Sequence, residues 1–413
     1  MSFKIQKSHI YIVTLALCIF IPYFNNYEIT FILWSLSSIV TVTMLYSKTI
    51  IKLMTCYLLI ITIAIVVMLF YDYGLYYIIR DITYLLKPVM GLAIGYQLCK
   101  RCYSKIFEIL VYIAFFIAIY HILTLFYAVV IHQARTVNDL RLFGGYFSDF
   151  EVYALIILIF HKKFELKISK NYLTAITVIV AISAFLYLAR TNFIQFAILY
   201  LAMMGYYKIN RNSMIVISTV AISALLFYTT ILYINPKRNG EGIEALLYKI
   251  KIAPVEPFKT RINAEDYKDF NDNYRSYENI HTVRQITSKG HLAVLFGEGM
   301  GSRVDLKREV WLGDMMLRHI SFLHNGFMTV LLKSGLTGIL IYLYSIYLLL
   351  KTRPSTIPIV KNVSLLLTGT GIFMIFSSWV FMGLYNLLDS KSILIGLLIC
   401  YQEIRSKQKI IVE

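Results

Sequence analysis

The chain has 413 residues, of which 58% are hydrophobic and 15% charged, and its mean hydropathy is +0.67. A soluble domain carries about 25% charged residues, so this composition excludes an ordinary soluble enzyme. The formal net charge of +17 does not indicate a nucleic-acid partner. Most lysines and arginines outside one long polar segment lie in short connectors on alternate sides of successive apolar runs, which is the positive-inside pattern of membrane proteins.

Apolar runs long enough to cross a bilayer recur along the whole chain. They predict an all-α, polytopic transmembrane bundle of about twelve spans, at 9–24, 28–46, 50–70, 75–98, 106–130, 148–160, 171–189, 191–207, 213–234, 325–350, 358–385 and 390–403. A β-barrel is not expected, because the runs are continuous and do not alternate with a period of two. The first run lacks a small-residue cleavage site, so we expect it to remain as a span.

The basic residues of the short connectors predict the orientation. Lys4 and Lys7 precede the first run, and Lys100 and Arg101 follow the fourth, whereas the connectors near 25–28 and 71–73 carry no lysine or arginine. Both termini are therefore expected in the cytoplasm. The chain divides into an N-terminal bundle of about nine spans (1–234), a large periplasmic loop (235–323) and about three C-terminal spans (324–413).

From Asn235 to Phe322 the chain becomes polar and charged, and it then returns directly to an apolar run. A segment of this length is seldom structureless and is often functional. We expect a helix from about Tyr277 to Ser288. None of the five cysteines lies in the segment, so no disulfide framework is implied. A water-exposed segment held between membrane spans predicts a site for a polar substrate.

Three positions among the spans depart from the usual composition of membrane helices. Arg190 lies at the outer junction of two runs, where it either faces a functional site or extends to headgroup phosphates. Lys87 precedes Pro88 inside the fourth run, where it either has a structural role or lines a cavity. Arg141 precedes the segment 144–149, whose glycines, aromatics and carboxylate suit a sugar-contacting loop and an ordinary turn equally well.

The polar segment holds further candidates: Arg275, Arg284, Arg303, the glycine-spaced turn of Gly297, Gly299 and Gly301, and the closing pair His324 and Asn325. The turn is not a nucleotide-binding fingerprint, because it does not follow a strand in a βαβ unit. We expect a tight turn whose backbone approaches the substrate. Asn325 is expected to orient His324. The chain has no HExxH, paired-cysteine or GxSxG pattern, so no metal site and no serine nucleophile is predicted.

Several of these pieces resemble, in order along the chain, the O-antigen polymerase and O-antigen ligase superfamily of bacterial membrane glycosyltransferases. They are Ala189-Arg190-Thr191, Val283-Arg284-Gln285, the turn from Phe296 to Ser302, His324-Asn325 and the stretch from Lys333 to Gly338. Lys87-Pro88 and the segment 144–149 are also similar to the family. The chain departs from the family pattern because no tryptophan closely follows Arg275 or Arg284. Arg284 is ranked ahead of Arg275, because its spacing to the glycine turn is closer to that of the polymerases.

The resemblance implies a GT-C-like fold in the bacterial inner membrane and a metal-independent glycosyltransferase without a cofactor. It implies that Arg190 and Arg284 hold the pyrophosphate of an undecaprenyl-pyrophosphate-linked glycan, and that His324 is the base or orients the acceptor. Substrate contacts are expected from a larger set: Arg275, Arg141, Asn325, Gly297, Gly299, Gly301, Arg303 and Lys87.

Polymerase activity on O-antigen or capsular repeat units is the first expectation, because the extended loop with its glycine turn is closer to the polymerases. A ligase that transfers polymer to lipid A core is the alternative from the same family. A flippase or other transporter without chemistry is a third reading, although its charges would lie near the midplane and its halves would often repeat. The expected partners are lipid-linked repeat units, membrane lipids, a chain-length regulator and a flippase. The sugars and their linkage stay open.

Overall fold

Most helices begin and end close to the boundaries of the apolar runs, but α2 ends six residues before the end of its run, at Val40, and α17 continues seven residues past the end of its run, to Ile410. The computed structural model describes residues 7–43, 45–145, 148–207, 210–238, 243–263, 265–312, 315–351, 355–386 and 389–410. Lys4, and Tyr146 and Phe147 of the segment 144–149, lie outside these ranges. The helices at the predicted spans are α1 (Lys7–Phe20), α2 (Tyr27–Val40), α3 (Lys48–Met68), α4 (Leu75–Cys102), α5 (Ile106–Val130), α7 (Asp149–Ile159), α8 (Lys170–Leu186), α9 (Arg190–Met203), α10 (Arg211–Ile234), α15 (Gly326–Leu350), α16 (Pro358–Val380) and α17 (Lys391–Ile410).

Five segments of the described chain are long and apolar enough to cross a membrane: Lys48–Met68, Leu75–Val130, Arg211–Ile234, Gly326–Leu350 and Pro358–Val380. The second of them contains both α4 and α5. Three further apolar helical stretches are shorter, at His9–Phe24, Tyr27–Val40 and Lys170–Leu186. The expectation of a mostly helical membrane protein is therefore confirmed, while the count of about twelve spans stays a prediction.

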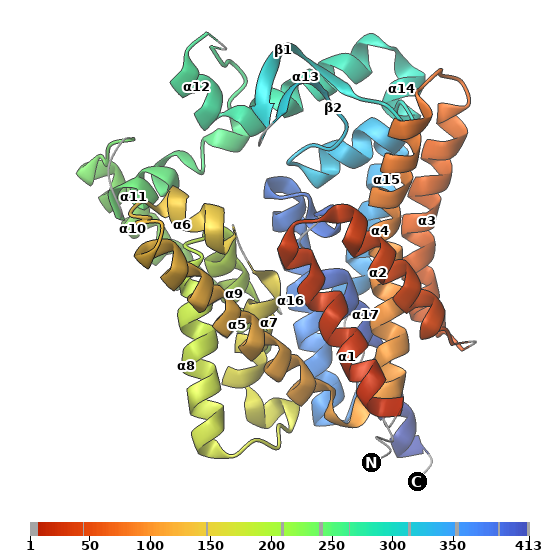
Figure 1. The fold of residues 1–413 in the computed structure, drawn as a ribbon, viewed down its shortest axis with the longest axis vertical. Coiled ribbons are helices and arrows are strands. Elements are labelled where there is room, and N and C mark those ends of the chain that lie inside the picture. The colour runs from red at the N-terminus through yellow and green to blue at the C-terminus, as the bar shows by residue number, and fades with distance from the viewer. Residues whose placement is uncertain are drawn as a thin grey trace.

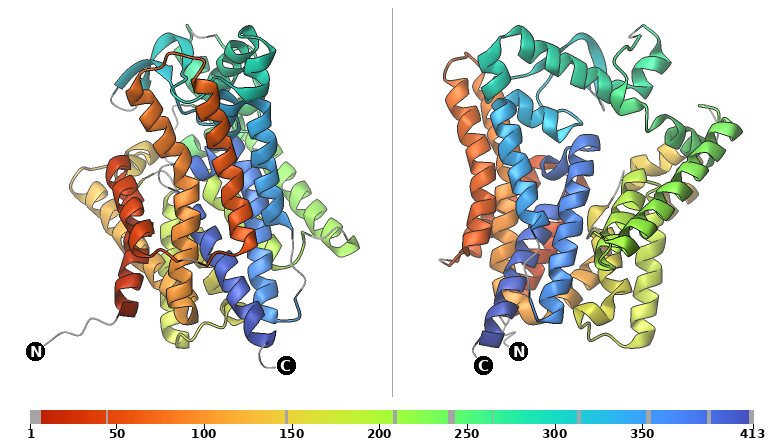
Figure 2. Two further views of the ribbon diagram at one scale, coloured as in Figure 1. Left: turned by 90° about the vertical axis from the view of Figure 1, so that its right-hand side faces the viewer. Right: turned by 180° about the vertical axis from the view of Figure 1, so that it is seen from behind.

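Two groups of helices stand side by side beneath a polar cap (Figures 1 and 2). One group contains α1 to α4 and α15 to α17, and the other contains α5 and α7 to α10. Helix α9 packs against α16 and joins the two groups. The chain ends lie at the bottom of Figure 1, and the polar segment covers the opposite end. The polar segment and the two chain ends therefore lie at opposite ends of the molecule.

Small residues allow α4 and α17 to pack with their backbones in contact. A Cβ atom added at Gly95 would lie 1.9 Å from the carbonyl oxygen of Ile393, and one at Gly396 would lie 2.2 Å from that of Leu92. Helices in a membrane associate largely through such close van der Waals packing. Helix α4 runs through Pro88 without ending, and Lys87 beside it is buried.

The polar segment is folded rather than extended. It contains α11 (Ile243–Ile252), α12 (Tyr267–Asp272), α13 (Tyr274–Ser288) and α14 (His291–Phe296), followed by the antiparallel hairpin of β1 (Val304–Leu312) and β2 (Met315–Ile320). The helix predicted from Tyr277 to Ser288 is confirmed, and it begins three residues earlier. The short helix α6 (Val137–Gly144), in the connector between α5 and α7, and the hairpin were not predicted.

The predicted span 358–385 is wrong at its C-terminal end. Helix α16 ends at Val380, and Met382 has a left-handed φ of 55°, followed by a short 3-10 turn at Gly383–Tyr385. The backbone N–H of Met382 donates to the carbonyl oxygen of His324 at 3.1 Å. Residues 381–386 therefore leave the helix and bring their backbone to the end of the polar segment.

Helix α15 is interrupted at Gly335, whose φ of 65° and ψ of −163° are not helical. A Cβ atom there would lie 2.4 Å from the carbonyl group of Leu295, so the end of α14 fits against the break. Just before the break, Lys333 Nζ lies 2.5 Å from Asp81 Oδ2 and 2.6 Å from the carbonyl oxygen of Ser302. Both charged side chains have no exposed surface. This ion pair joins α4, α15 and the polar segment.

We expect Lys333→Met to lower the free energy of unfolding by about 3–5 kcal/mol. It removes the ammonium group that lies 2.5 Å from the buried Asp81 carboxylate, which then keeps only the N–H of Gly301 and the more distant Arg80 guanidinium, at 3.9 Å. The double variant with Asp81→Asn removes both charges and should recover part of that loss. Thermal unfolding in detergent measures the effect. The matched control is Glu165→Gln, which breaks the exposed pair between Glu165 and Arg405 and should cost at most about 1 kcal/mol. Equal losses in Lys333→Met and in the control would contradict the prediction.

Candidate active site

A buried carboxylate holds the histidine that ends the polar segment. His324 Nδ1 lies 3.0 Å and 3.1 Å from the two carboxylate oxygens of Glu278, and the backbone N–H of His324 donates to Glu278 Oε2 at 3.0 Å. An ionised carboxylate only accepts hydrogen bonds, so the proton of a neutral imidazole is placed on Nδ1. The lone pair of Nε2 is then available as a base. The Glu278 side chain is 1% exposed and that of His324 is 41% exposed.

Local structure fixes this pair in place. Glu278 lies within α13, one turn after Tyr274, whose ring meets the imidazole edge to face at 5.7 Å. Burial, and then the charge of Glu278, raise the pKa of the Tyr274 phenol well above its usual range. His324 directly precedes Asn325, the N-cap residue of α15. The end of one helix and the middle of another therefore determine the position of the imidazole.

Three arginines line a cavity of about 480 Å³ between the polar segment and the helices. Its walls are Arg141, Ala189, Arg190, Thr191, Ile194, Ala253, Pro254, Glu256, Phe258, Arg275, Phe376, Trp379, Val380 and Phe381. Arg190 Nη2 lies 3.9 Å from Glu256 Oε2, and Arg275 Nη1 lies 3.5 Å from Glu256 Oε1. One carboxylate therefore holds two guanidinium groups beside each other.

Backbone carbonyl groups orient the arginines further. Arg141 donates from Nε to the carbonyl oxygen of Tyr187 at 3.2 Å and from Nη2 to that of Leu188 at 2.5 Å. Arg190 is the first residue of α9 and donates to the carbonyl oxygen of Lys249. Burial, and then the guanidinium groups of Arg141 and Arg190, lower the pKa of Lys249. The charged residues lining the cavity are three cations and one anion, which favours a ligand with negative charge.

Much of the remaining wall of the cavity is aromatic, with aliphatic residues such as Ile194 and Pro254 beside it. Phe376, Trp379 and Phe381 come from the end of α16 and the residue after it, and Phe258 stacks on Trp379 with ring centroids 6.3 Å apart. Aromatic faces can cover either a sugar ring or a hydrocarbon chain. The cavity thus combines a cationic side with an apolar side, as an amphipathic anion would require.

The cavity and the Glu278–His324 pair are neighbours. Arg275 and Glu278 lie three residues apart on α13, so about one turn of helix separates them. On the opposite side, Phe381 lines the cavity and the next residue, Met382, is hydrogen-bonded to the backbone of His324. His324 and Glu278 do not themselves line the cavity, but residues next to them on both sides do.

The contacts correct the pairing of arginines expected from the sequence. Arg190 shares Glu256 with Arg275 and not with Arg284. Arg284 lies nine residues further along α13, about 13 Å along the helix axis, where it lines a separate depression with Arg261 and His281. Arg275 and Arg141 were expected only as secondary substrate contacts, and the structure places both with Arg190. The tertiary contacts, rather than the spacing to the glycine turn, decide which arginines meet.

The glycine turn is part of the packing and does not face a cavity. Gly297, Gly299 and Gly301 all have positive φ angles, of 79°, 82° and 85°, and residues 297–302 are buried. Cβ atoms added at Gly297 and Gly299 would lie within 2.6 Å of backbone nitrogens of α15 and α3. The N–H of Gly301 donates to Asp81. The expectation that this turn approaches the substrate is therefore wrong, because helices occupy the space around it.

Asn325, Lys87 and Arg303 also have structural partners in place of the expected substrate contacts. Asn325 is 1% exposed and its side chain accepts from the N–H of Met328, so it caps α15 while Glu278 orients His324. Lys87 is buried, donates to the carbonyl oxygen of Asn386 and lies over the Trp34 ring at 5.3 Å. The Arg303 guanidinium lies over the Tyr77 ring at 3.9 Å.

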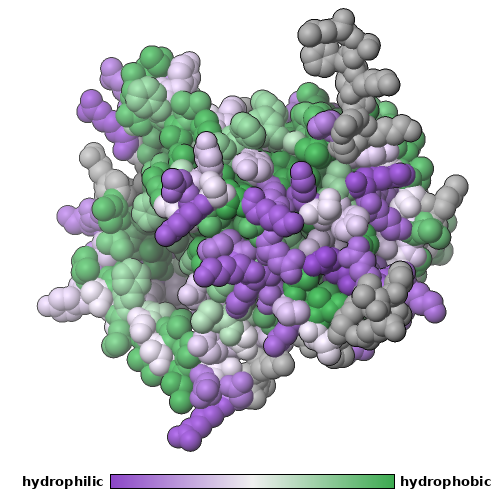
Figure 3. Space-filling view, turned by 90° about the horizontal axis from the view of Figure 1, so that it is seen from below, coloured by the Kyte–Doolittle hydropathy of each residue, from purple (hydrophilic) through white to green (hydrophobic). Residues whose placement is uncertain are grey.

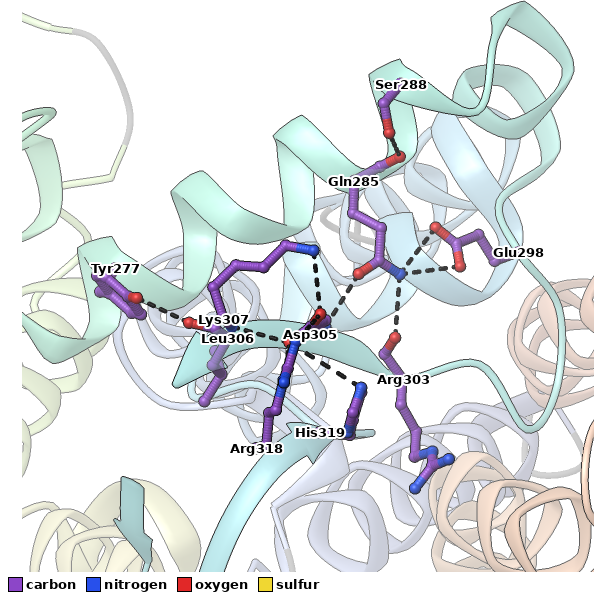
Figure 4. A network of polar contacts seen from close by, with 10 residues as sticks. All are labelled: Tyr277, Gln285, Ser288, Glu298, Arg303, Asp305, Leu306, Lys307, Arg318 and His319. Carbon is purple, nitrogen blue, oxygen red and sulfur yellow. Dashed lines mark hydrogen bonds and ion pairs between the residues drawn. The ribbon is translucent and has the colours of Figure 1, made fainter. Parts of the chain in front are cut away.

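A separate polar network ties α13 to the hairpin (Figure 4). Gln285 Nε2 donates to both carboxylate oxygens of Glu298 and to the carbonyl oxygen of Arg303, while its Oε1 accepts from the N–H of Asp305. Arg318 donates to both oxygens of Asp305 at 2.9 Å and 3.1 Å. The hydrogen bonds from Arg318, and then those from Lys307, hold the pKa of Asp305 well below its usual range. The network fixes α13, which carries Arg275 and Glu278.

Glu278, Glu256 and Trp379 were not predicted as parts of a site. Glu278 falls inside the helix predicted from Tyr277, but nothing in the local pattern separates it from the other carboxylates of the segment. Within the described residues, no group of three or more histidine, cysteine, aspartate or glutamate side chains is arranged to hold a metal ion. No protein-family model, curated protein or solved structure matches the chain.

Proposed function

We propose that this protein is a bacterial polysaccharide polymerase. It transfers the growing glycan from undecaprenyl pyrophosphate to a hydroxyl of the next lipid-linked repeat unit, at the outer face of the cytoplasmic membrane. The observation that carries the proposal is the position of the arginine-lined cavity directly beside the Glu278–His324 pair. The proposal includes the GT-C-like bundle of about twelve spans, the cytoplasmic termini and the periplasmic polar segment.

The arginines suit the leaving group. As the bond between the anomeric carbon and the pyrophosphate oxygen breaks, negative charge grows on the pyrophosphate. Guanidinium groups match phosphate oxygens in pairs and stay charged at all relevant pH values. Arg190 and Arg275 are already oriented by Glu256, and Arg141 by backbone carbonyls. Little reorganisation is then needed when the charge develops, and such preorganised donors are an effective form of catalysis.

The histidine suits the attacking hydroxyl. In the proposed step the acceptor oxygen forms a bond to the anomeric carbon, and the hydroxyl proton moves to Nε2 of His324. Lipid pyrophosphate leaves with the electron pair of the broken bond. Glu278 keeps the other imidazole proton on Nδ1 and stabilises the imidazolium that forms, as carboxylates do beside catalytic histidines. No metal ion is required by this scheme.

The position of the cavity arginines supports an enzyme over a transporter. Arg141, Arg190 and Arg275 gather at the end of the bundle that the polar segment covers. The polymerase reading is preferred to a ligase because of the extended polar segment. A ligase that uses the same lipid-linked donor and a lipid A core acceptor is the competing outcome of the experiment below.

The deciding experiment is a gel of surface polysaccharide from a deletion strain, complemented with the wild-type chain or with His324→Ala. We expect the ladder to collapse to a single-repeat band in the deletion strain and to return with the wild-type chain alone. Loss of every decorated band, with polymer retained on the lipid carrier, would identify a ligase. An unchanged ladder would contradict both activities for that polysaccharide.

A further inference from the structure

A second pocket lies at the other end of the seam between α9 and α16. It has a volume of about 420 Å³, and its walls include Lys163, Met203, Met204, Lys361, Asn362 and Leu365. The arginine-lined cavity lies at the Arg190 end of α9 and the Trp379 end of α16, whereas this pocket lies at the Met203 end of α9 and the Pro358 end of α16. Because α9 is 14 residues long, the two are separated by about 20 Å along the helix.

The polar side of this pocket carries only positive charge. Lys163 and Lys361 line it, and none of the described residues that line it is acidic. Lys163 Nζ donates to the carbonyl oxygen of Met203 at 2.7 Å, and Asn362 Nδ2 donates to the carbonyl oxygen of Lys163 at 2.9 Å, so the lysine is fixed at the seam. Burial, and then the charge of Lys361, lower the pKa of Lys163. Both lysines line the same pocket, so an anion bound there would be attracted to two positive charges.

Apolar side chains also line the pocket: Met204, which is 44% exposed, and Met203 and Leu365, which are buried. Helix α16 starts at Pro358 without a side-chain cap and continues as one of the segments long enough to span a membrane. Its first residues are therefore expected at a membrane surface, where the orphan N–H groups of a helix N-terminus also favour an anion. Figure 3 views the end of the molecule that carries both chain termini, and hydrophilic side chains gather across its middle.

We propose that this pocket binds the phosphate of an anionic phospholipid headgroup, with Lys163 and Lys361 on the phosphate and an acyl chain along the exposed Met204. The shared chemistry is a phosphate group, and the apolar wall selects a lipid over a free ion. Helix α9 belongs to one group of helices and α16 to the other, so the bound lipid stabilises their junction. The inference does not depend on the proposed polymerase activity.

The test uses the purified full chain in nanodiscs of phosphatidylglycerol or of phosphatidylcholine, followed by native mass spectrometry and thermal unfolding. We expect phosphatidylglycerol to be retained and to raise Tm in the wild-type chain. The double variant Lys163→Gln/Lys361→Gln should lose roughly thirtyfold in apparent lipid affinity, at about fivefold for each lysine near an anionic headgroup. Lys163→Arg/Lys361→Arg keeps both charges and should retain the lipid.

The matched control is Lys48→Gln/Lys52→Gln, which removes two exposed lysines at the start of α3 that do not line the pocket. Equal losses in both glutamine variants would mean that surface charge alone attracts the lipid, which would overturn the proposal. A third arm adds inorganic phosphate to phosphatidylcholine nanodiscs. If phosphate alone raised Tm as much as phosphatidylglycerol does, the ligand would be a free anion and the lipid assignment would be wrong.

Discussion

Replacing His324 by alanine is expected to lower the rate of glycan transfer by about two to four orders of magnitude, the usual contribution of a general base. The side chain is 41% exposed, so its removal should leave folding largely unchanged. Glu278→Gln should cost less, roughly ten- to a hundredfold, because the imidazole remains while its orientation and the stabilisation of its charged form are lost. The measurement is transfer of a labelled lipid-linked glycan by the purified protein.

The chain supplies its own control for this prediction. His319 lies in the same polar segment and also faces a carboxylate, with Nε2 3.9 Å from Asp305 Oδ1. It belongs to the network between α13 and the hairpin (Figure 4), whereas His324 is held by Glu278. His319→Ala should therefore keep most of the activity. If His319→Ala and His324→Ala lowered the rate of glycan transfer equally, the effect would be a structural one on the polar segment. The assignment of His324 as the base would then be wrong.

The second large effect is expected at the arginines. Arg190→Ala and Arg275→Ala should each lower the rate by about 10²–10³, the range observed when one preorganised donor to a developing negative charge is removed. Lysine at either position keeps the charge but loses the paired N–H donors, so it should restore only part of the rate. Arg284→Ala should have a small effect, because Arg284 lines a different depression. Single-turnover kinetics with excess enzyme separate this effect from substrate binding.

Arg238→Ala is the matched control for the arginine variants. Arg238 also pairs with a carboxylate of the polar segment, with Nε 3.1 Å from Asp272 Oδ1, but it does not line the cavity. If Arg284→Ala were as damaging as Arg190→Ala while Arg275→Ala remained active, the assignment of the cavity as the pyrophosphate site would fail. The variants of Arg275 and Arg284 therefore test which arginine of the polar segment acts with Arg190. The tertiary contacts indicate Arg275, and the sequence resemblance indicates Arg284.

The positions of most helices could be predicted from the sequence, because the length and apolar composition of a run are enough to identify a membrane-spanning helix. A helix in a membrane satisfies its backbone hydrogen bonds within one segment, so its existence needs no knowledge of the neighbours. α3, α5 and α10 accordingly match the runs to within two residues. The same argument fails where the chain leaves the helix because of a contact with another part of the chain. Residues 381–386 read as a continuation of α16, yet a hydrogen bond to His324 holds them in another conformation.

The hairpin and the break in α15 depend on contacts that local patterns do not contain. β1 is rich in charged residues, and Gln285 of α13 holds its Asp305 in place. Gly335 lies in an apolar run that is typical of an unbroken helix, but the end of α14 fits against it. In both cases the stabilising partner is distant in sequence.

For the candidate site, the sequence by itself determined which residue types are present and on which side of the bundle they are expected. Arg190, Arg141, Arg275 and His324 were all found as charged or polar residues at the outer ends of apolar runs or in the polar segment. Only the tertiary structure decided that Arg275 rather than Arg284 joins Arg190, that Glu278 rather than Asn325 orients His324, and that the glycine turn is buried. The physical reason is that hydrogen bonds and ion pairs depend on distances of a few ångströms, and residues distant in the sequence reach them only after the helices have packed.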